Sequence, residues 1–393
     1  MPGRRALSYS PAAMHDRRRF LELSGLALLG GLSGRAAWAK ASPDGAPHAL
    51  LVQTLRPENL ATPIEWYDRL LTPTDVFFVR SHFGAPAVVR DPRLRIEGLV
   101  GKPLDLGLAD LQGLPQVTLT AVTQCAGNGR ALMEPRVPGV QWVHGAMGQA
   151  TWTGVRLRDL LERAGVAAGA AHVEFKGSDV PPKPSVPAFV RSLPLERARD
   201  ATTLVALAMN GEPLTNAHGA PFRLVVPGWS ANHWMKWLSV IRVQEGEAAG
   251  FYMQTGYRFP RTPVEPGTAV APENMVPVTA FPVKSVIARP LAGSRRPRRR
   301  DEIAGVAFSG EAAIAAVEVS VDGGSTWAHA TLEGEPGVGR WQVFRHRFDA
   351  RPGRQRATAR ATDTRGNVQP PRPVWNPSGY FWNAWHTVEW EVV

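Results

Sequence analysis

The only cysteine of the 393-residue chain, Cys125, stands in the segment Thr-Gln-Cys-Ala-Gly-Asn-Gly-Arg at residues 123–130. A single thiol excludes an internal disulfide, a zinc site built from cysteines and an iron–sulfur cluster. The glycines on either side of Asn128 favour a tight turn that lets the backbone approach a ligand closely, and Arg130 favours the thiolate over the thiol. Because a thiolate held in a cofactor pocket is a soft metal ligand, we interpret Cys125 as a metal ligand rather than an inert core residue.

A competing hypothesis makes Cys125 a catalytic nucleophile, with His144 or His233 as its general base. Cysteine nucleophiles occur in recognisable, family-specific sequence motifs. No such Cys–His motif surrounds Cys125, so metal ligation is the favoured interpretation.

Two further segments place cationic side chains beside turns. Arg80 and His82 occupy alternate positions of an extended segment, so their side chains should point to the same side. Three more cations lie between glycines and prolines further along the chain: His218, Arg223 and Lys236. Alone, each is typical of surface charge or of a structural histidine. Together with Cys125, they predict a pocket for phosphate or another oxyanion.

Short elements must position these residues. A hydrophobic content of 44% and a charged content of 20% are typical of a globular protein and argue against a disordered one. The 38 glycines and 35 prolines suit a loop-rich, largely β protein, and the length predicts about two domains. Apolar residues at helical spacing over residues 157–164, followed by Gly165, predict one short amphipathic helix, and residues 222–226 predict a strand.

The C-terminal part alternates apolar and polar residues. Val317, Val319 and Val321 do so before an Asp-Gly-Gly turn, and the alanines at 357, 359 and 361 do so before an Arg-Gly-Asn turn. Short alternating strands with glycine turns indicate an immunoglobulin-like β-sandwich. Prolines concentrated around residues 260–276 indicate a linker before it. We therefore expect an α+β, β-rich fold with a catalytic domain at 40–272 and a sandwich at 273–393.

The N-terminus has the pattern of an export signal. Arg17–Arg19 precede an apolar stretch from Leu23 to Leu32, and Ala37-Trp38-Ala39 resembles a cleavage site. The order Asp-Arg-Arg-Arg-Phe-Leu is similar to a twin-arginine signal, so we expect residues 1–39 to export the folded protein to the periplasm. An ordinary secretory signal or a basic arm is the alternative.

Neither a membrane nor a nucleic acid is an expected partner. The apolar stretch of the leader is too short for a stable span, and no other run of about 20 apolar residues occurs. The basic run at residues 295–300 has no stacking motif beside it, which argues against nucleic acid binding.

The motifs, taken in order, resemble those of the sulfite oxidase family of molybdenum enzymes. The resemblance covers essentially the whole chain after residue 39. It rests on the following segments: Phe78–His82, Gln124–Arg130, Gly177–Asp179, His218–Arg223, Val226–Gly228, Lys236–Leu238 and Val319–Trp327. Within the family, the chain most resembles bacterial periplasmic sulfite dehydrogenases that reduce a separate cytochrome c.

The resemblance implies a role for each motif. Cys125 would be the protein thiolate on molybdenum, Arg80 and Arg130 would line the oxyanion pocket, and Tyr257 would be the active-site tyrosine, with Tyr252 as a nearby competitor. The pterin and its phosphate would be held by a larger set: Phe78, Val79, Arg80, Ser81, His82, Cys125, Asp179, His218, Arg223, Trp234, Met235 and Lys236.

The activity implied is oxidation of sulfite to sulfate by oxo transfer at a molybdenum–molybdopterin cofactor, with a cytochrome c as electron acceptor. Arginines would orient the substrate dianion, and a tyrosine hydroxyl would hydrogen-bond near the oxo group. No Cys-x-x-Cys-His motif and no cytochrome b5 segment occur, so no haem is expected in this chain. Family members pair through the C-terminal domain, which suggests a homodimer; a heterodimer with a cytochrome subunit is the alternative.

Two positions depart from the family pattern. Animal and plant sulfite oxidases carry an arginine in a Trp-Asn-x-Arg-Gly motif, where this chain has Ser378, and the aspartate before the tyrosine is Gly256 here. A sulfur dehydrogenase-type subunit acting on another sulfur compound is therefore a second hypothesis. The sandwich argues against the smaller sulfoxide-reductase type, which lacks one. A non-enzymatic secreted β-sandwich binding protein is a third hypothesis, and it leaves the Cys125 motif unexplained.

Overall fold

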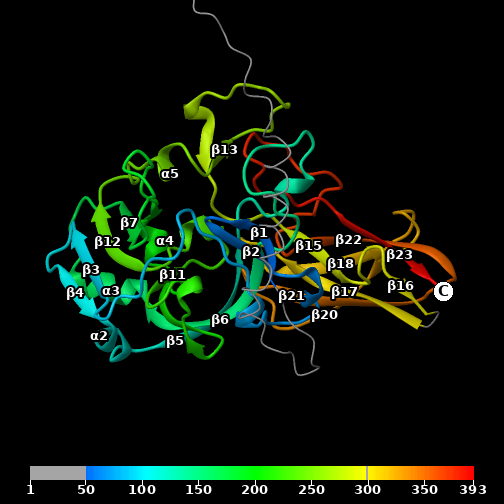
Figure 1. The fold of residues 1–393 in the computed structure, drawn as a ribbon, viewed down its shortest axis with the longest axis horizontal. Coiled ribbons are helices and arrows are strands. Elements are labelled where there is room, and N and C mark those ends of the chain that lie inside the picture. Colours follow the sequence, from blue (N-terminus) through cyan, green and yellow to red (C-terminus); the bar gives the residue numbers. More distant parts are fainter. Residues whose placement is uncertain (1–49, 298–299) are drawn as a thin grey trace, which may run out of the picture. The chain divides into compact units, whose positions relative to one another are not determined.

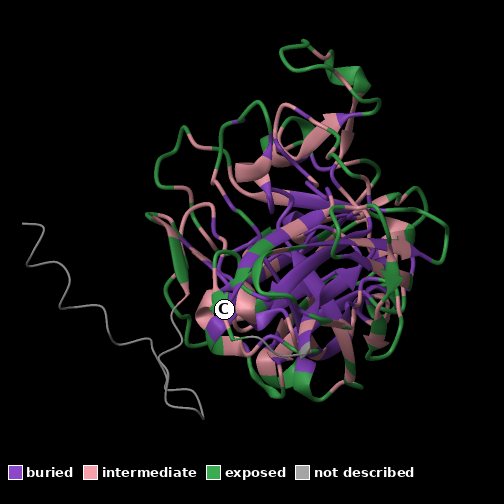
Figure 2. Ribbon diagram, turned by 90° about the vertical axis from the view of Figure 1, so that its right-hand side faces the viewer, coloured by how far each residue is buried: buried purple, intermediate pink, exposed green. Residues whose placement is uncertain are grey.

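A computed structural model describes residues 50–297 and 300–393. The predicted signal at residues 1–39 lies outside the described residues and stays a prediction. The described chain is rich in strands and its helices are short, which confirms the predicted β-rich α+β class. Burial is concentrated in the central strands, whereas the outer loops are exposed (Figure 2).

After an N-terminal two-stranded ribbon, the first half of the described chain continues with ten strands and four short α-helices. The strands are β3 Arg93–Gly98, β4 Leu104–Gly107, β5 Val117–Gln124, β6 Met147–Arg156, β7 His172–Gly177, β8 Val190–Pro194, β9 Leu204–Met209, β10 Glu212–Pro213, β11 Arg223–Val225 and β12 Leu238–Gln244. The helices are α2 Leu108–Gln112, α3 Leu157–Ala164, α4 Leu195–Ala198 and α5 Phe251–Gln254. A ribbon of β1 Leu51–Leu55 and β2 Glu58–Ala61 precedes them.

These strands form two five-stranded sheets (Figure 1). One has the order β10-β9-β6-β5 with β11 beside β9, and the other has the order β4-β3-β12-β7-β8. One apolar core joins them, and its members include Trp152, Phe175 and Ile241, all fully buried. The loops at the strand ends supply the pocket described below.

Helix α3 is the predicted amphipathic helix. All four of its apolar residues at i, i+3, i+4 and i+7 are fully buried, because these positions share one helical face, and the helix packs against β6. Gly165 ends it with φ +66°, a left-handed conformation that glycine adopts without strain.

The second half is the predicted sandwich. Its strands are β15 Lys284–Arg289, β16 Arg295–Arg296, β17 Arg300–Phe308, β18 Ile314–Ser320, β19 Ala328–His329, β20 Thr331–Glu333, β21 Gln342–Asp349, β22 Gly353–Asp363 and β23 His386–Val392. They form sheets of order β15-β17-β21-β20 and β16-β23-β22-β18-β19. Val317, Val319 and the alternating alanines of β22 fill the space between the sheets. Val321 is 41% exposed because β18 has already ended at Ser320.

The two halves share a buried interface. Tyr67, Val122 and Met147 from the first half pack with Phe308 and Trp341 of the sandwich in one apolar cluster. Polar groups inside the interface are also paired: the Trp341 backbone N–H donates to Gln149 Oε1 at 2.7 Å, and Gln149 Nε2 donates to the Trp341 carbonyl at 3.2 Å. The sandwich is therefore packed as part of the same body as the sheets.

The predicted linker at residues 260–276 is an excursion with paired ends. β13 (Arg258–Pro260) and β14 (Met275–Pro277) run antiparallel, with Pro260 opposite Met275. The prolines between them exclude a regular ladder, so the segment leaves and returns at one place (Figure 1). The domain boundary predicted at 272–273 falls within this excursion and stays a prediction.

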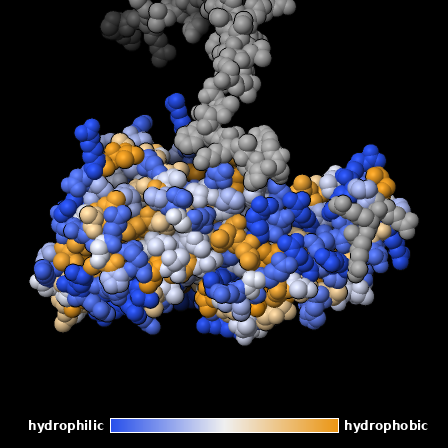
Figure 3. Space-filling view, turned by 90° about the horizontal axis from the view of Figure 1, so that it is seen from below, coloured by the Kyte–Doolittle hydropathy of each residue, from blue (hydrophilic) through white to orange (hydrophobic). Residues whose placement is uncertain are grey.

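The surface is mixed in character. On the face seen in Figure 3, apolar side chains lie in small groups among hydrophilic ones. Within residues 50–297 and 300–393, no helix is long and apolar enough to cross a membrane.

Candidate active site

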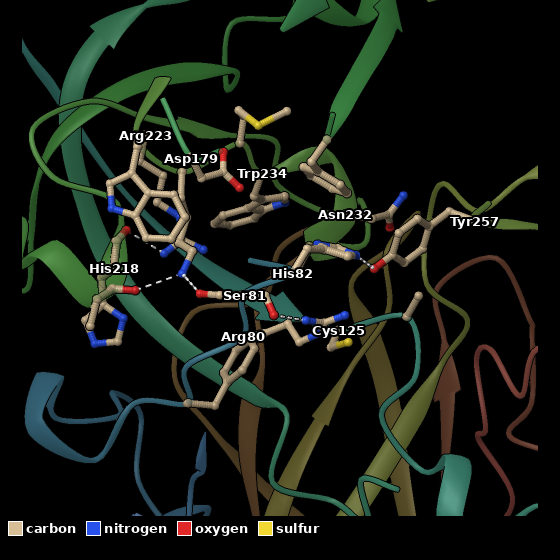
Figure 4. A pocket seen from close by; sticks show the side chains of 18 residues that line it. Arg80, Ser81, His82, Cys125, Asp179, His218, Arg223, Asn232, Trp234 and Tyr257 are labelled. Carbon is tan, nitrogen blue, oxygen red and sulfur yellow. Dashed lines mark hydrogen bonds between the residues drawn. The ribbon is translucent and has the colours of Figure 1, made fainter. Parts of the chain in front are cut away.

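Loops at the strand ends enclose a pocket with about 660 Å³ of unfilled space, part of it open to solvent. Its lining comes from segments far apart in the sequence: Phe78, Arg80, Ser81, His82, Cys125, Ala126, Asp179, Phe189, Ala217, His218, Arg223, Ala231, Asn232, Trp234, Met235, Lys236, Trp237 and Tyr257. The fold thus brings together the thiol, the cations and the tyrosine that the sequence singled out (Figure 4).

Cys125 lies directly after β5, in a turn that hydrogen bonds to Ala146 stabilise. Its backbone N–H donates to the Ala146 carbonyl at 2.9 Å, and the Ala146 N–H donates to Asn128 Oδ1 at 3.1 Å. Gly129 follows with φ +95°, and a Cβ placed on it would lie 2.6 Å from the Cβ of Trp382. Gly129 was expected to let the backbone approach a ligand closely. Its missing side chain also lets Trp382 of the C-terminal half pack on this turn.

Replacing Gly129 by alanine should destabilise the protein by about 1–3 kcal/mol or more, because it adds backbone strain and a steric clash. Urea unfolding of the purified variant measures this. Gly169→Ala is the matched control, since Gly169 also has positive φ (+83°) but nothing within 4 Å of the added Cβ. If both variants lost the same free energy of unfolding, the contact between Gly129 and Trp382 would be contradicted.

One end of the pocket is cationic. The Lys236 Nζ atom donates to Ser81 Oγ at 2.9 Å and to the Ala217 carbonyl at 3.0 Å. Arg223 lies between tryptophan rings, with its guanidinium carbon 4.9 Å from the Trp152 ring centroid, and donates to the His218 carbonyl at 2.9 Å. Arg223 lies on the side of the pocket opposite Tyr257 (Figure 4).

These cations have too few counter-charges. Burial lowers the pKa of Arg223 to about 9, and burial together with Arg223 lowers the pKa of Lys236 well below its usual range. Among the described residues that line the pocket, Asp179 is the sole carboxylate. The Arg223 Nε atom is buried without a partner within the described part of the chain. This end fits an anionic group such as a phosphate.

The other end contains Cys125 and a cluster of aromatic rings. The Tyr257 hydroxyl and His82 Nε2 share a hydrogen bond of 2.9 Å, and the Phe189 ring stacks on His82 with centroids 4.3 Å apart. Burial raises the pKa of Tyr257 and lowers the pKa of His82 well below its usual range. Both groups are therefore uncharged at neutral pH.

Two residues outside the lining support Tyr257. The Tyr380 ring is stacked on it with centroids 5.6 Å apart and an interplanar angle of 14°. The Arg191 guanidinium lies 5.6 Å from the Tyr257 ring centroid and contacts His233 Nε2 at 2.9 Å. Tyr257 itself has φ +56°, a strained conformation that these contacts stabilise.

Every predicted site residue except Val79 and Arg130 lines this pocket. Val79 is buried and its backbone pairs with Leu60. Arg130 donates from Nε to the Ser378 carbonyl at 2.9 Å and from Nη1 to the Val140 carbonyl at 3.1 Å. In this arrangement, its guanidinium joins the cysteine turn to the C-terminal segment, and its predicted role toward the oxyanion stays a prediction.

Neither of the two histidines considered as a base for Cys125 has a hydrogen bond to its thiol within the described residues. His233 contacts Arg191 and the Val278 carbonyl. His144 packs against Trp382 and His386 and is outside the lining of the pocket. This arrangement favours a ligand role for the thiol over a nucleophilic one.

The sequence reasoning assigned no role to several residues of the site: Ala126, Phe189, Arg191, Ala217, Ala231, Asn232, Trp237 and Tyr380. Ala126 and Trp237 stand inside the Gln124–Arg130 and Lys236–Leu238 motifs, and Asn232 stands just before Trp234, so these positions were within reach of the sequence patterns. Phe189 and Arg191 lie in no motif. Their contribution comes from the pairing of β7 with β8, which brings the end of β8 to the pocket.

Comparison with known proteins agrees with this geometry. Residues 82–252 match the model of an oxidoreductase molybdopterin binding domain, and residues 276–392 match a Mo-co oxidoreductase dimerisation domain. Mouse mitochondrial sulfite oxidase is 36% identical over 369 residues, which are 88% of this chain and 66% of the mouse protein. This chain therefore spans just under two thirds of the length of that relative.

Two further relatives match over most of their length. Chicken sulfite oxidase is 34% identical over 401 residues, covering 95% of this chain and 86% of the chicken protein. The crystal structure of the sulfane dehydrogenase SoxCD from Paracoccus pantotrophus superposes with a TM-score of 0.74 at 28% identity, covering 92% of this chain and 95% of that chain. With the thiol, the cationic pocket and the sandwich in place, these matches show that the chain belongs to the sulfite oxidase family of molybdenum oxidoreductases.

Proposed function

We propose that this protein oxidises sulfite to sulfate at a molybdenum–molybdopterin cofactor and passes the electrons to a separate cytochrome c in the periplasm. The observation that carries the proposal is the pocket itself, which has a thiol at one end and cations without sufficient counter-charge at the other. Curated relatives of this family named sulfite oxidase support the choice of substrate.

The residues present fit such a cofactor. Cys125 would supply the thiolate ligand, and Arg223, Lys236 and Ser81 would hold the phosphate. Trp234 and Phe78, which also line the pocket, would contact the pterin. When bound, the cofactor supplies two-electron oxo-transfer chemistry. The protein excludes water, orients the substrate and provides fixed positive charge.

At the thiol end, Arg80 and Tyr257 would receive the substrate anion. Arg80 is half-buried and is held by Asn59 Oδ1 at 3.3 Å and by the Ser81 carbonyl, so its charge is oriented before substrate arrives. The neutral Tyr257–His82 pair adds a hydrogen-bonding group without adding charge. Such preorganised groups lower the barrier because they need little reorientation during the reaction.

Replacing Tyr257 by phenylalanine should lower kcat/KM for sulfite by about 10–100-fold, since it removes one oriented hydroxyl. The melting temperature should change little. Steady-state kinetics with cytochrome c as acceptor measure the effect. Tyr252→Phe is the matched control because its ring lies 4.9 Å from the His82 centroid without the hydroxyl contact to that imidazole. A larger loss in the control would assign the role to Tyr252 instead.

The periplasmic location and the cytochrome partner rest on the twin-arginine-like leader and on the resemblance to periplasmic sulfite dehydrogenases. The proposed dimer rests on the match to a dimerisation domain. Metal analysis of the exported protein, followed by a sulfite and cytochrome c assay on the same sample, tests the whole proposal. A chain without molybdenum from a host that makes the cofactor would overturn it.

A second candidate is oxidation of another sulfur compound. Two observations favour it: Ser378 is uncharged where the family resemblance predicts arginine, and the SoxCD structure is a sulfane dehydrogenase. Comparing kcat/KM for sulfite with that for thiosulfate separates the two. A loaded enzyme that is slower with sulfite than with thiosulfate would favour the second candidate.

A further inference from the structure

A group of basic side chains lies buried between the two halves of the molecule, outside the pocket described above. Lys284 is the first residue of β15, His386 begins β23, and His144 comes from the loop before β6. Their exposed fractions are 1%, 8% and 7%. The His144 and His386 ring centroids are 4.3 Å apart. The Lys284 Nζ atom lies 5.3 Å from the Trp382 ring centroid, and the His144 ring lies 5.4 Å from it.

This group has donors without acceptors. Lys284 Nζ and His144 Nδ1 are buried, and neither has a hydrogen-bond partner in the described part of the chain. The Nδ1 atom of His386 accepts a hydrogen bond from the Ile287 backbone N–H at 2.9 Å. A neutral imidazole whose Nδ1 accepts must carry its proton on Nε2. His386 therefore offers an Nε2–H donor beside a lysine whose own donors are unused.

The group also lacks a counter-charge. Burial lowers the pKa of Lys284 to about 7 and that of His386 to about 3, and Lys284 contributes to the second shift. Burial, His386 and Lys284 lower the pKa of His144 well below its usual range. No carboxylate of the described residues is among the causes of these shifts. In the part of the chain that the structure describes, the charge interactions that contribute to these shifts are those among these three groups.

We propose that Lys284, His386 and His144 form a binding site for a small monovalent anion, such as chloride, at the junction of the two halves. The anion accepts hydrogen bonds from the lysine ammonium and the His386 Nε2–H, and it neutralises a charge that water cannot neutralise. His386 and His144 each retain a small exposed fraction, whereas Lys284 is almost completely enclosed.

Binding is coupled to a proton. The anion binds the ammonium form of Lys284, so binding takes up a proton whenever that lysine is neutral beforehand. With a free pKa of about 7, the apparent affinity should be about tenfold weaker near pH 8 than near pH 6. Ionic strength alone would not give this dependence on pH.

The test uses purified holoprotein. Its melting temperature is measured in sodium chloride and in sodium gluconate of equal ionic strength, since gluconate is too large for the site. Chloride should raise the melting temperature in a saturable way, and more strongly near pH 6 than near pH 8. Crystals soaked in sodium bromide should show an anomalous peak between Lys284 Nζ and His386 Nε2.

Lys284→Met keeps a long side chain and removes the charge, so it should abolish the chloride effect while the protein still folds, because no hydrogen bond is lost. Lys102→Met, at an exposed lysine, should keep the effect. The proposal is overturned if gluconate stabilises as well as chloride, if Lys284→Met retains the difference, or if bromide occupies surface positions only, as an adventitious ion only.

Discussion

Replacing Cys125 by serine should abolish molybdenum retention and lower activity by about 1000-fold or more, because a hydroxyl is far less acidic than a thiol and is a hard ligand in place of a soft one. The polypeptide should still fold. Cys125 is 6% exposed, and the two side chains have nearly the same shape. Metal analysis and circular dichroism on the same sample measure both outcomes.

The control for this change is a variant in the same turn that leaves the thiol in place. Ala126→Ser adds the same hydroxyl one residue later and should retain most of the metal. If Cys125→Ser kept stoichiometric molybdenum and normal turnover, the thiolate assignment would be wrong. If the Cys125→Ser variant lost molybdenum only because it unfolded, its molybdenum content and its circular dichroism signal would decrease together.

Replacing Lys236 by methionine should have opposite effects on the loaded and the empty protein. The loaded enzyme should lose the cofactor during gel filtration, with retention falling by about 100-fold or more, because one charge-assisted contact to phosphate is removed from a buried site. The melting temperature of the empty variant should be no lower than that of the empty wild type. Lys236 is buried near the like-charged Arg223 and Arg80, and few negative charges offset their repulsion.

The pH dependence of the empty protein gives a separate check. Burial and the neighbouring cations lower the pKa of Lys236 in the folded state below its unfolded value. In the pH range between these two pKa values the unfolded chain binds more protons, so wild-type stability rises with pH there. The methionine variant should lack this contribution. Lys176→Met, at an exposed lysine on β7, is the control, and an identical pH profile in all three proteins would contradict the cationic end of the site.

The sequence pattern correctly predicted those helices and strands in which the spacing of apolar residues alone decides which face is buried. Helix α3 and strand β22 bury the residues that their spacing assigns to one face. Val321 lies in a turn instead, because alternation continues past the point where hydrogen bonding of β18 ends. The proline-rich linker has paired ends, and this pairing across 14 intervening residues is not visible in a local pattern.

The same distinction holds in the site. Cys125, Arg223 and Lys236 stand in motifs whose turn residues and charges are visible in the sequence. Arg191 and Tyr380 are not visible in this way, because each contacts Tyr257 only after distant segments have packed. Sequence patterns therefore identified the groups that carry chemistry better than the groups that hold them in position.

The hydrogen bond from Arg130 to the Ser378 carbonyl spans 248 positions of the chain, and the Phe381 backbone N–H donates to the Ala126 carbonyl at 2.9 Å. The cysteine turn is thus completed by a segment that is synthesised long after it. Until that later segment has been made and has packed, the nascent chain has the thiol but not its support. A chain truncated before residue 376 should therefore remain empty however much cofactor the cell makes.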